Sequence, residues 1–99
     1  AGCNFSEVYL SGANLSEAIL VNSDFHLANL SEAKLPKADV WKADFWEANL
    51  SDVDLSQVQM LGYARFEEAF GLAKEQQDII LRALRATWRQ HHFHWDPAT

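Results

Sequence analysis

The chain has 99 residues, the size of one domain, and its 8 basic and 14 acidic side chains give a formal net charge of -6. Its composition, 48% hydrophobic and 22% charged, is typical of a soluble globular chain, and no apolar run approaches the roughly 18 residues of a transmembrane helix. With one cysteine and an acidic balance, we expect neither a disulfide scaffold nor a nucleic-acid-binding or membrane protein.

A five-residue repeat occupies the first sixty residues. Every fifth position is hydrophobic: Phe5, Leu10, Leu15, Leu20, Phe25, Leu30, Leu35, Val40, Phe45, Leu50, Leu55 and Met60. Two positions earlier the residue is small, most often Ala, and the position between the two is usually Asn or Asp. A period of five matches neither helix nor strand, so a turn must recur in every unit. Because Phe occupies the central position only at 5, 25 and 45, we predict a four-sided coil of twenty residues with stacked Phe rings.

The segments A-N-L-S-E (28–32), A-D-F-W-E (43–47) and A-N-L-S-D (48–52) resemble the A-(D/N)-L-x-x motif of the pentapeptide-repeat family. The resemblance covers residues 3–62. It implies an all-β solenoid, a right-handed quadrilateral pentapeptide-repeat β-helix whose central and small residues point inward. At twenty residues per coil, the repeats predict about three coils.

A C-terminal helix is expected to cover the last coil. The register slips after Met60, with Phe66 and Phe70 continuing the apolar spacing. From Ala73 to about His92, the apolar residues Ile80, Leu84 and Trp88 recur every four positions, with Leu81, Ala83 and Thr87 beside them and Arg82, Arg85 and Arg89 opposite. We predict an amphipathic helix that closes the coil together with Phe66, Phe70 and Leu72. The chain then divides into a β-helix, residues 1–70, and a capping helix and tail, residues 71–99, within one structural domain.

The N-terminal end has no such cover, because only Ala1 and Gly2 precede the first repeat. Cys3 falls in the small column, so we interpret it as a buried small hydrophobic residue rather than as a lipid-bearing cysteine. Three explanations of an open first coil remain: excision from a larger protein, pairing with a second copy as a homodimer, or a partner that adds strands. We favour the first two equally.

No constellation of residues indicates catalysis. His91, His92 and His94 cluster beside Asp96, but adjacent histidines on a helix point about 100° apart, which disfavours a shared metal ion. There is no Gly-rich phosphate loop and no isolated pair of carboxylates in an apolar segment. We therefore predict no enzyme activity, no metal and no cofactor.

Apolar side chains at outward positions indicate a contact surface. Most outward positions carry Ser, Glu, Asp, Asn or Lys, and the exceptions are Ile19, Val21, Leu27, Trp41, Trp46 and Leu61. In a twenty-residue coil Val21, Trp41 and Leu61 stack in one column, with Ile19 beside it and Trp46 and Leu27 round the corner. Because such patches usually mark interaction sites, we predict that these six residues bind another protein. The alternative is that the tail, residues 63–99, covers them with Trp88, Phe93 or Trp95.

The function that these features favour is a non-enzymatic protein-interaction or scaffold domain, with an unidentified protein partner. The resemblance implies an alternative, an acidic mimic of DNA that binds a type II topoisomerase such as gyrase. Residues 1–70 hold 11 acids and 4 bases, a net charge of -7, which fits mimicry. A rod of about three coils is short, however, and Lys34, Lys37 and Lys42 interrupt the negative charge. The resemblance also implies a bacterial, often cyanobacterial, or plastid source, and we favour the cytoplasm over the periplasm or thylakoid lumen.

Overall fold

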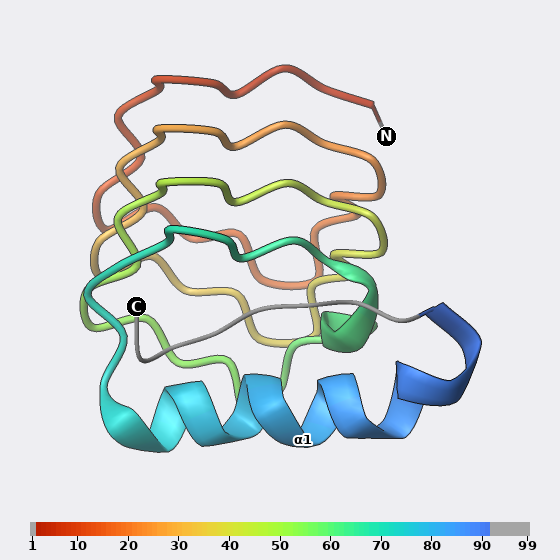
Figure 1. Cartoon of the computed structure of the whole chain (residues 1–99). Helices are drawn as coiled ribbons and strands as arrows, with labels where there is room; N and C mark the ends of the chain where they lie inside the picture. Colours follow the sequence, from red (N-terminus) through yellow and green to blue (C-terminus); the bar gives the residue numbers. More distant parts are fainter. Residues whose placement is uncertain (1, 92–99) are drawn as a thin grey trace.

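The computed structural model describes residues 2–91, and the side chains of residues 2–86. The chain winds into stacked four-sided coils, with a 3-10 helix η1 (Leu61–Tyr63) in the last coil and an α-helix α1 (Lys74–His91) across the end of the stack (Figure 1). Its β structure consists of single parallel bridges between coils rather than longer strands. The N-terminus lies at the end of the stack opposite α1 (Figure 1).

Each corner of a coil is built from two local features of the five-residue unit. The side chain of Asn14 accepts the N–H of Ser16 at 3.0 Å, and the Asx residues of the other units repeat this contact. The next residue, Glu17, adopts a left-handed conformation with φ 61°, and the N–H of Ala18 then closes the turn on the carbonyl of Leu15 at 3.1 Å. Asn and Asp are suited to such turns because their side chains accept a hydrogen bond from the backbone N–H two residues later in the chain.

The coils stack in a register of twenty residues. We number the walls one to four in chain order; in the first coil they are residues 3–5, 8–10, 13–15 and 18–20. Bridges join Asn4 to Asp24 and Asp24 to Asp44 on wall one, and the other walls begin with the same spacing. The rings of Phe5 and Phe25, and of Phe25 and Phe45, stack with centroids 5.0 Å apart. The predicted stack of Phe rings inside one wall is therefore confirmed.

The hydrophobic core fills the inside of the coils. Central residues from Leu20 to Leu55 are at most 5% exposed, and the small residues Ala28, Ala38 and Ala48 are at most 1% exposed. In the first coil Phe5, Leu10 and Leu15 are only half-buried, because nothing in the described chain stacks above them. Cys3, predicted to be buried, is exposed for the same reason. The core therefore begins at Leu20, at the end of the first coil.

The chain contains one extra residue where it enters the last coil, after the bridge from Asp39 to Gln59. Two predictions are wrong for this reason. The next bridges join Asp44 to Arg65 and Asn49 to Phe70, a spacing of 21. Met60, predicted to point inward, is 51% exposed, and Leu61, predicted to point outward, is 5% exposed in the core. Both predictions are wrong because η1 takes up the additional residue and exchanges the inward and outward positions.

Phe66 replaces the expected central residue in this coil, since its ring stacks on Phe45 with centroids 5.1 Å apart. Phe70 lies beside Asn49 at an outward position and is 54% exposed. The expectation that Phe70 closes the last coil is therefore wrong.

Helix α1 packs one face on the core. Ile80 is fully buried, and Leu72, Ile79, Ala83 and Leu84 pack against the same cluster. Arg82 and Arg85 are exposed, as predicted, whereas the side chains of Trp88 and Arg89 lie outside the described residues. The side chain of Gln76 accepts a hydrogen bond from the backbone N–H of Leu55 at 2.7 Å. No backbone acceptor within the described residues pairs with this N–H. Within the described chain, no helix combines the length and hydrophobicity that crossing a bilayer requires.

Candidate functional site

Five of the six predicted contact residues lie on the outer surface, at or beside the two corners that flank wall one. Val21 and Trp41 lie at the corner between wall four and wall one, and Ile19 lies beside them on wall four. Leu27 and Trp46 lie at the corner between walls one and two. We call these five residues the Trp surface. Leu61 does not belong to it, because it is buried in the core beside η1.

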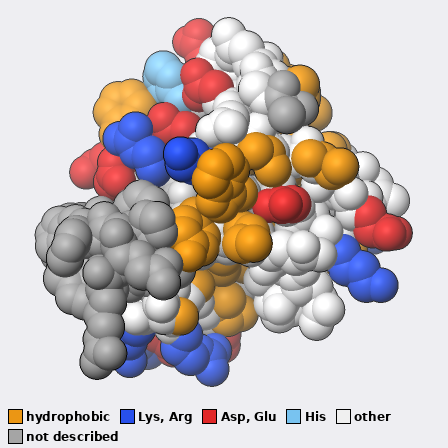
Figure 2. All heavy atoms as spheres, turned by 90° about the vertical axis from the view of Figure 1, so that its right-hand side faces the viewer, with side chains coloured by type: hydrophobic (Ala, Val, Ile, Leu, Met, Phe, Trp, Pro, Cys, Tyr) orange, Lys and Arg blue, Asp and Glu red, His pale blue; other side chains and the backbone are white. Residues whose placement is uncertain are grey.

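The first corner combines apolar area with a cation. Ile19 is 69% exposed, and Val21 and Trp41 are half-buried. The backbone N–H of Trp41 donates to the carboxylate of Asp39 at 3.1 Å, and Lys42 Nζ lies 4.5 Å from the centroid of the Trp41 ring. Figure 2 views the side of the molecule on which η1 lies, and hydrophobic side chains gather near the centre of that face.

The second corner presents two more exposed apolar side chains. Leu27 is 43% exposed and Trp46 is 36% exposed. The Trp46 ring packs against His26, with centroids 5.1 Å apart and ring planes tilted by 59°. Sequence reasoning did not select His26, although its place twenty residues before Trp46 puts the two side chains in one column.

Carboxylates lie between the two corners. Asp24 and Asp44 stack on wall one, and the Asp44 carboxylate accepts the backbone N–H of Trp46 at 3.0 Å. Arg65, one coil further on, lies 3.7 Å from Asp44 and bonds Glu67 at 2.9 Å, and this bond to Glu67 raises the pKa of Arg65 above its ordinary value. The Trp surface is thus apolar at its two corners and acidic in its centre.

Exposed hydrophobic residues also occur away from the Trp surface. Tyr9 is 78% exposed, and Met60 and Phe70 expose about half of their surface. The sequence carries a signal for Tyr9, since it replaces the Asn or Asp of its unit, but sequence reasoning did not select it. Met60 and Phe70 could not be found in this way because the extra residue of the last coil moves them outward.

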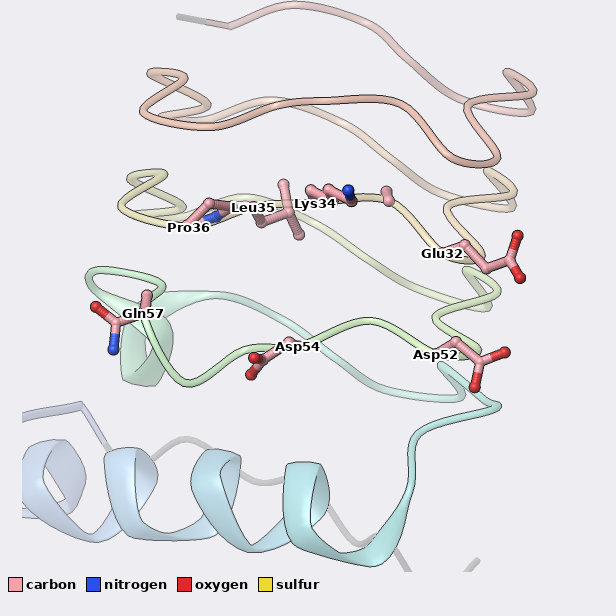
Figure 3. A pocket seen from close by; sticks show the side chains of 8 residues that line it. Glu32, Lys34, Leu35, Pro36, Asp52, Asp54 and Gln57 are labelled. Atoms are coloured by element: carbon pink, nitrogen blue, oxygen red, sulfur yellow. The ribbon is translucent and has the colours of Figure 1, made fainter.

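A hollow of about 490 Å³ opens on wall three, between the second and third coils (Figure 3). No bridge joins Lys34 to Asp54 among the described residues, and the N–H of Lys37 bonds Gln57 rather than Ser56, the position that the repeat predicts. In Figure 3, Lys34, Leu35 and Pro36 line one side, Asp54 and Gln57 the other, and Glu32 and Asp52 one end. The backbone N–H of Ser56 bonds Asp54 at 2.9 Å and lowers the pKa of that carboxyl. The sequence carries no clear signal for this opening.

The described residues offer no metal site and no catalytic constellation. No group of three metal-ligating side chains comes together within residues 2–86. The cluster of His91, His92, His94 and Asp96 lies outside the described side chains. What the surface can do chemically is bind, through aromatic and aliphatic area with acidic side chains between.

Comparisons with known proteins agree on the repeat. The family model described as pentapeptide repeats matches residues 3–41 and 28–62, with eight copies. A search of curated protein sequences found no match. Among solved structures, the chain is similar to HetL, a pentapeptide repeat protein involved in heterocyst differentiation regulation from the cyanobacterium Nostoc sp. strain PCC 7120, with 26% identity and a TM-score of 0.30. The match covers 70% of this chain and 36% of HetL, so the chain spans about a third of that protein's length.

A second similar structure is a pentapeptide repeat protein from the thylakoid lumen of Arabidopsis thaliana. Its identity to this chain is 20% and the TM-score is 0.26. The match covers 84% of this chain and 74% of the plant protein.

Proposed function

This chain belongs to the pentapeptide-repeat family, and on that basis we propose that it is a non-enzymatic protein-interaction domain that binds its partner through the Trp surface. Members of the family fold as right-handed quadrilateral β-helices and are generally structural or interaction proteins. In such a fold, inward residues build the core and outward residues are free to serve recognition.

The observation that carries the proposal is the exposure of Ile19, Leu27 and Trp46, which is 69%, 43% and 36%. These side chains point away from the core, so packing inside the coils does not require them to be apolar. Other units carry mostly polar residues at the equivalent positions: Asn or Asp at that of Ile19, Glu or Lys at that of Leu27, and Ser at that of Trp46. Large aromatic and aliphatic side chains at solvent-facing positions are typical of binding surfaces, and Trp is prominent among residues that dominate binding energy.

The charges on the surface indicate the chemistry of the partner. Asp24, Asp39 and Asp44 are half-buried beside the two Trp residues, and each accepts a backbone N–H at its own corner. Asp24 and Asp39 remain available for a cation on a partner, because an ionised carboxylate accepts several hydrogen bonds. Asp44 already lies 3.7 Å from Arg65. We expect the partner segment to carry Lys or Arg beside apolar side chains, which fill the two corners.

Affinity capture with matched variants tests this function. The bait is the full chain, beside a Trp41→Ala/Trp46→Ala variant and a control, Met60→Ala/Phe70→Ala, which removes exposed apolar area elsewhere. A partner captured by the wild type and the control but lost with the Trp variant supports the proposal. Its affinity for purified bait should then fall with added salt and with Asp24→Asn/Asp44→Asn. A partner that binds all three baits equally contradicts the assignment of this surface.

We further propose that α1 caps the last coil and that residues 1–70 and 71–99 form one structural unit. The support is the fully buried Ile80 and the bond from the Leu55 N–H to Gln76, both of which tie the helix to the coils. A solenoid end without a cover would expose apolar residues and unpaired backbone groups.

The alternative function is mimicry of DNA toward a type II topoisomerase such as gyrase. The charge of the coil body favours it, with 11 acids and 4 bases in residues 1–70. Gyrase supercoiling assayed with excess protein decides between the two functions: inhibition that the Trp41→Ala/Trp46→Ala variant retains supports mimicry, and unchanged supercoiling removes it.

A further inference from the structure

Three of the four walls join the second and third coils by the same two backbone bonds. In each, the residue just before the central one uses its N–H and its carbonyl to bond the coil before it. On wall two, the N–H of Asn49 donates to the carbonyl of Ala28 at 2.9 Å, and the carbonyl of Asn49 accepts the N–H of Leu30 at 2.9 Å. Walls one and four make the same pair of bonds between these coils.

Wall three lacks both bonds. By the same rule they would join Asp54 to Ala33 and to Leu35, as the preceding pair of coils is joined at Lys34, at 2.8 and 2.7 Å. Within the described residues, the N–H groups of Leu35 and Asp54 and the carbonyls of Ala33 and Asp54 have no hydrogen-bond partner. Two donors and two acceptors therefore remain unpaired in this part of the wall.

Some of these unpaired groups belong to buried residues. Leu35 is 1% exposed and Ala33 is 2% exposed, so bulk water has little access to them. Buried backbone N–H and C=O groups are nearly always paired, because an unpaired one costs about as much free energy as a lost hydrogen bond. A molecule that supplied the missing partners would therefore stabilise this wall.

The unpaired groups lie in a bounded opening. At one end the N–H of Glu32 donates to the carbonyl of Ser51 at 2.7 Å, and at the other the N–H of Lys37 donates to the carbonyl of Gln57 at 2.8 Å. Because the two coils stay joined on both sides, an extended strand has no room to add itself along the wall. This limits the occupant to a small molecule.

The hollow at this place has the size and lining of a small-molecule site. Its volume of about 490 Å³ lies within the roughly 300–1,000 Å³ of ligand pockets. Leu35 and Pro36 supply apolar surface, and the unpaired backbone groups supply polar contacts. Ligand pockets typically combine an apolar lining with a few polar groups that orient the ligand.

The mouth of the hollow is acidic. Glu32, Asp52 and Asp54 lie around it with Lys34 as the single cation (Figure 3). Within the described residues, none of these four side chains forms an ion pair. The bond from the Ser56 N–H lowers the pKa of Asp54, so this carboxylate is ionised at neutral pH. An excess of negative charge favours a ligand that carries a cation.

We propose that the hollow on wall three binds a small cationic molecule that carries a carboxamide. On the other walls, the unpaired groups of the second coil meet the peptide amide of the next coil, and a carboxamide is its chemical equivalent. Its carbonyl accepts the N–H of Leu35 or Asp54, and its nitrogen donates to the carbonyl of Ala33 or Asp54. The cation lies at the acidic mouth, and the rest of the ligand contacts Leu35 and Pro36.

Titration of the isotope-labelled full chain with leucinamide tests the site. This probe combines a protonated amino group, an isobutyl group and a primary carboxamide, and amide NMR spectra are recorded at about pH 6, below the pKa of an α-amino group. The backbone signals of Leu35, Asp54 and Gln57 should shift, and those of Phe25 and Asp44 on the opposite wall should not. A dissociation constant of about 1–10 mM is expected for a ligand of this size.

Two relatives of the probe separate the contributions of its groups. Isocaproamide lacks the amino group and should bind about threefold more weakly, because the attraction to the carboxylates is lost. Isoamylamine lacks the carboxamide and should bind about fivefold more weakly, because the backbone groups stay unpaired. If isoamylamine bound as tightly as leucinamide, the assignment of a carboxamide would be wrong.

The variant Asp54→Asn tests the acidic mouth while keeping the turn, since Asn49 accepts the N–H of Ser51 in the same way at 3.0 Å. It should weaken leucinamide by about threefold and leave isocaproamide unchanged. The matched control is Asp39→Asn. Asp39 also accepts a backbone N–H, that of Trp41, but lies on wall four outside the hollow. This control should change neither ligand.

Two results overturn the proposal. One is the absence of shifts on wall three at a leucinamide concentration about tenfold above the expected dissociation constant. The other is an equal effect of Asp54→Asn and Asp39→Asn on leucinamide binding.

This site is separate from the proposed function, because the hollow lies on wall three and the Trp surface flanks wall one. The variant Trp41→Ala/Trp46→Ala should therefore leave leucinamide binding unchanged, and Asp54→Asn should leave capture of a protein partner unchanged.

Discussion

At the scale of single residues, each position of the repeat carries one type of side chain, and a residue of another type at that position is easily recognised. Ser23 is the one residue of the small column between Ala18 and Val53 that is not Ala. Its side chain is 1% exposed, and its hydroxyl has no hydrogen-bond partner within the described chain. A buried hydroxyl without a partner costs free energy because it has lost its bonds to water.

We therefore expect Ser23→Ala to raise the free energy of unfolding by about 1 kcal/mol, the cost of an unmade hydrogen bond. Urea unfolding followed by circular dichroism measures it. The reverse change one coil on, Ala43→Ser, is the control and should lower the same quantity, because Ala43 is fully buried. A loss of stability in Ser23→Ala would show that the hydroxyl is bonded in solution.

Gly71 is required by a close approach as well as by its backbone angle. Its φ is 89°, and a Cβ there would overlap the side chain of Ser51 and lie 2.9 Å from the Ser51 backbone nitrogen. Gly12 has a similar φ of 72° with nothing within 4 Å of its Cβ position. Of these two glycines, only Gly71 therefore leaves no room for a Cβ.

The change Gly71→Ala should cost more stability than Gly12→Ala, which bears only the left-handed strain of about 1 kcal/mol. Thermal unfolding of the two variants gives the comparison directly. Equal melting temperatures would mean that Ser51 moves aside without cost.

At the scale of elements, the coils and α1 depend on one another at the last coil. Leu55 has its N–H on the side that faces the helix, and Gln76 supplies the acceptor that a further coil would have supplied. Ile80 inserts from the middle of α1 into the core. The helix is thus tied to the coils by a hydrogen bond and by a buried side chain.

Truncating Ile80 to Ala should lower the free energy of unfolding by about 2–4 kcal/mol, since a buried Ile is replaced by a cavity. Chemical denaturation measures the loss, and Arg82→Ala, on the exposed side of the same helix, is the control. If the two variants were equally stable, α1 would not be a cap.

At the scale of the whole molecule, exposed apolar side chains lie on the Trp surface and, apart from it, at Tyr9, Met60 and Phe70. The core itself begins at Leu20, at the end of the first coil. The Trp surface faces sideways and suits a partner beside the rod.

Fluorescence quenching tests the exposure of the Trp surface. In a Trp88→Phe/Trp95→Phe background, acrylamide should quench the emission of the remaining Trp41 and Trp46. Trp46 should be quenched more strongly than Trp41, which is half-buried and lies beside Lys42. Single-Trp variants separate the two. Protection of both residues in the free protein would indicate that another part of the chain covers them.

The sequence by itself determined the features that repeat. A five-residue period with Asn or Asp and a small residue in each unit specifies local turns, and Phe at 5, 25 and 45 specifies their stacking. The four-sided coil, the inward columns up to Leu55, the bounds of the amphipathic helix within a residue or two, and five of the six surface residues therefore follow from the pattern.

Only the tertiary structure decided what happens where the pattern ends. An extra residue in η1 buries Leu61 and exposes Met60, because the chain must cross from the last coil to the helix while keeping Phe66 under Phe45. The opening on wall three and the acceptor that Gln76 offers to Leu55 are likewise features of the tertiary structure that no sequence pattern indicates. Local periodicity determines a turn within five residues, but the register between distant segments is set by which packing buries the most apolar surface.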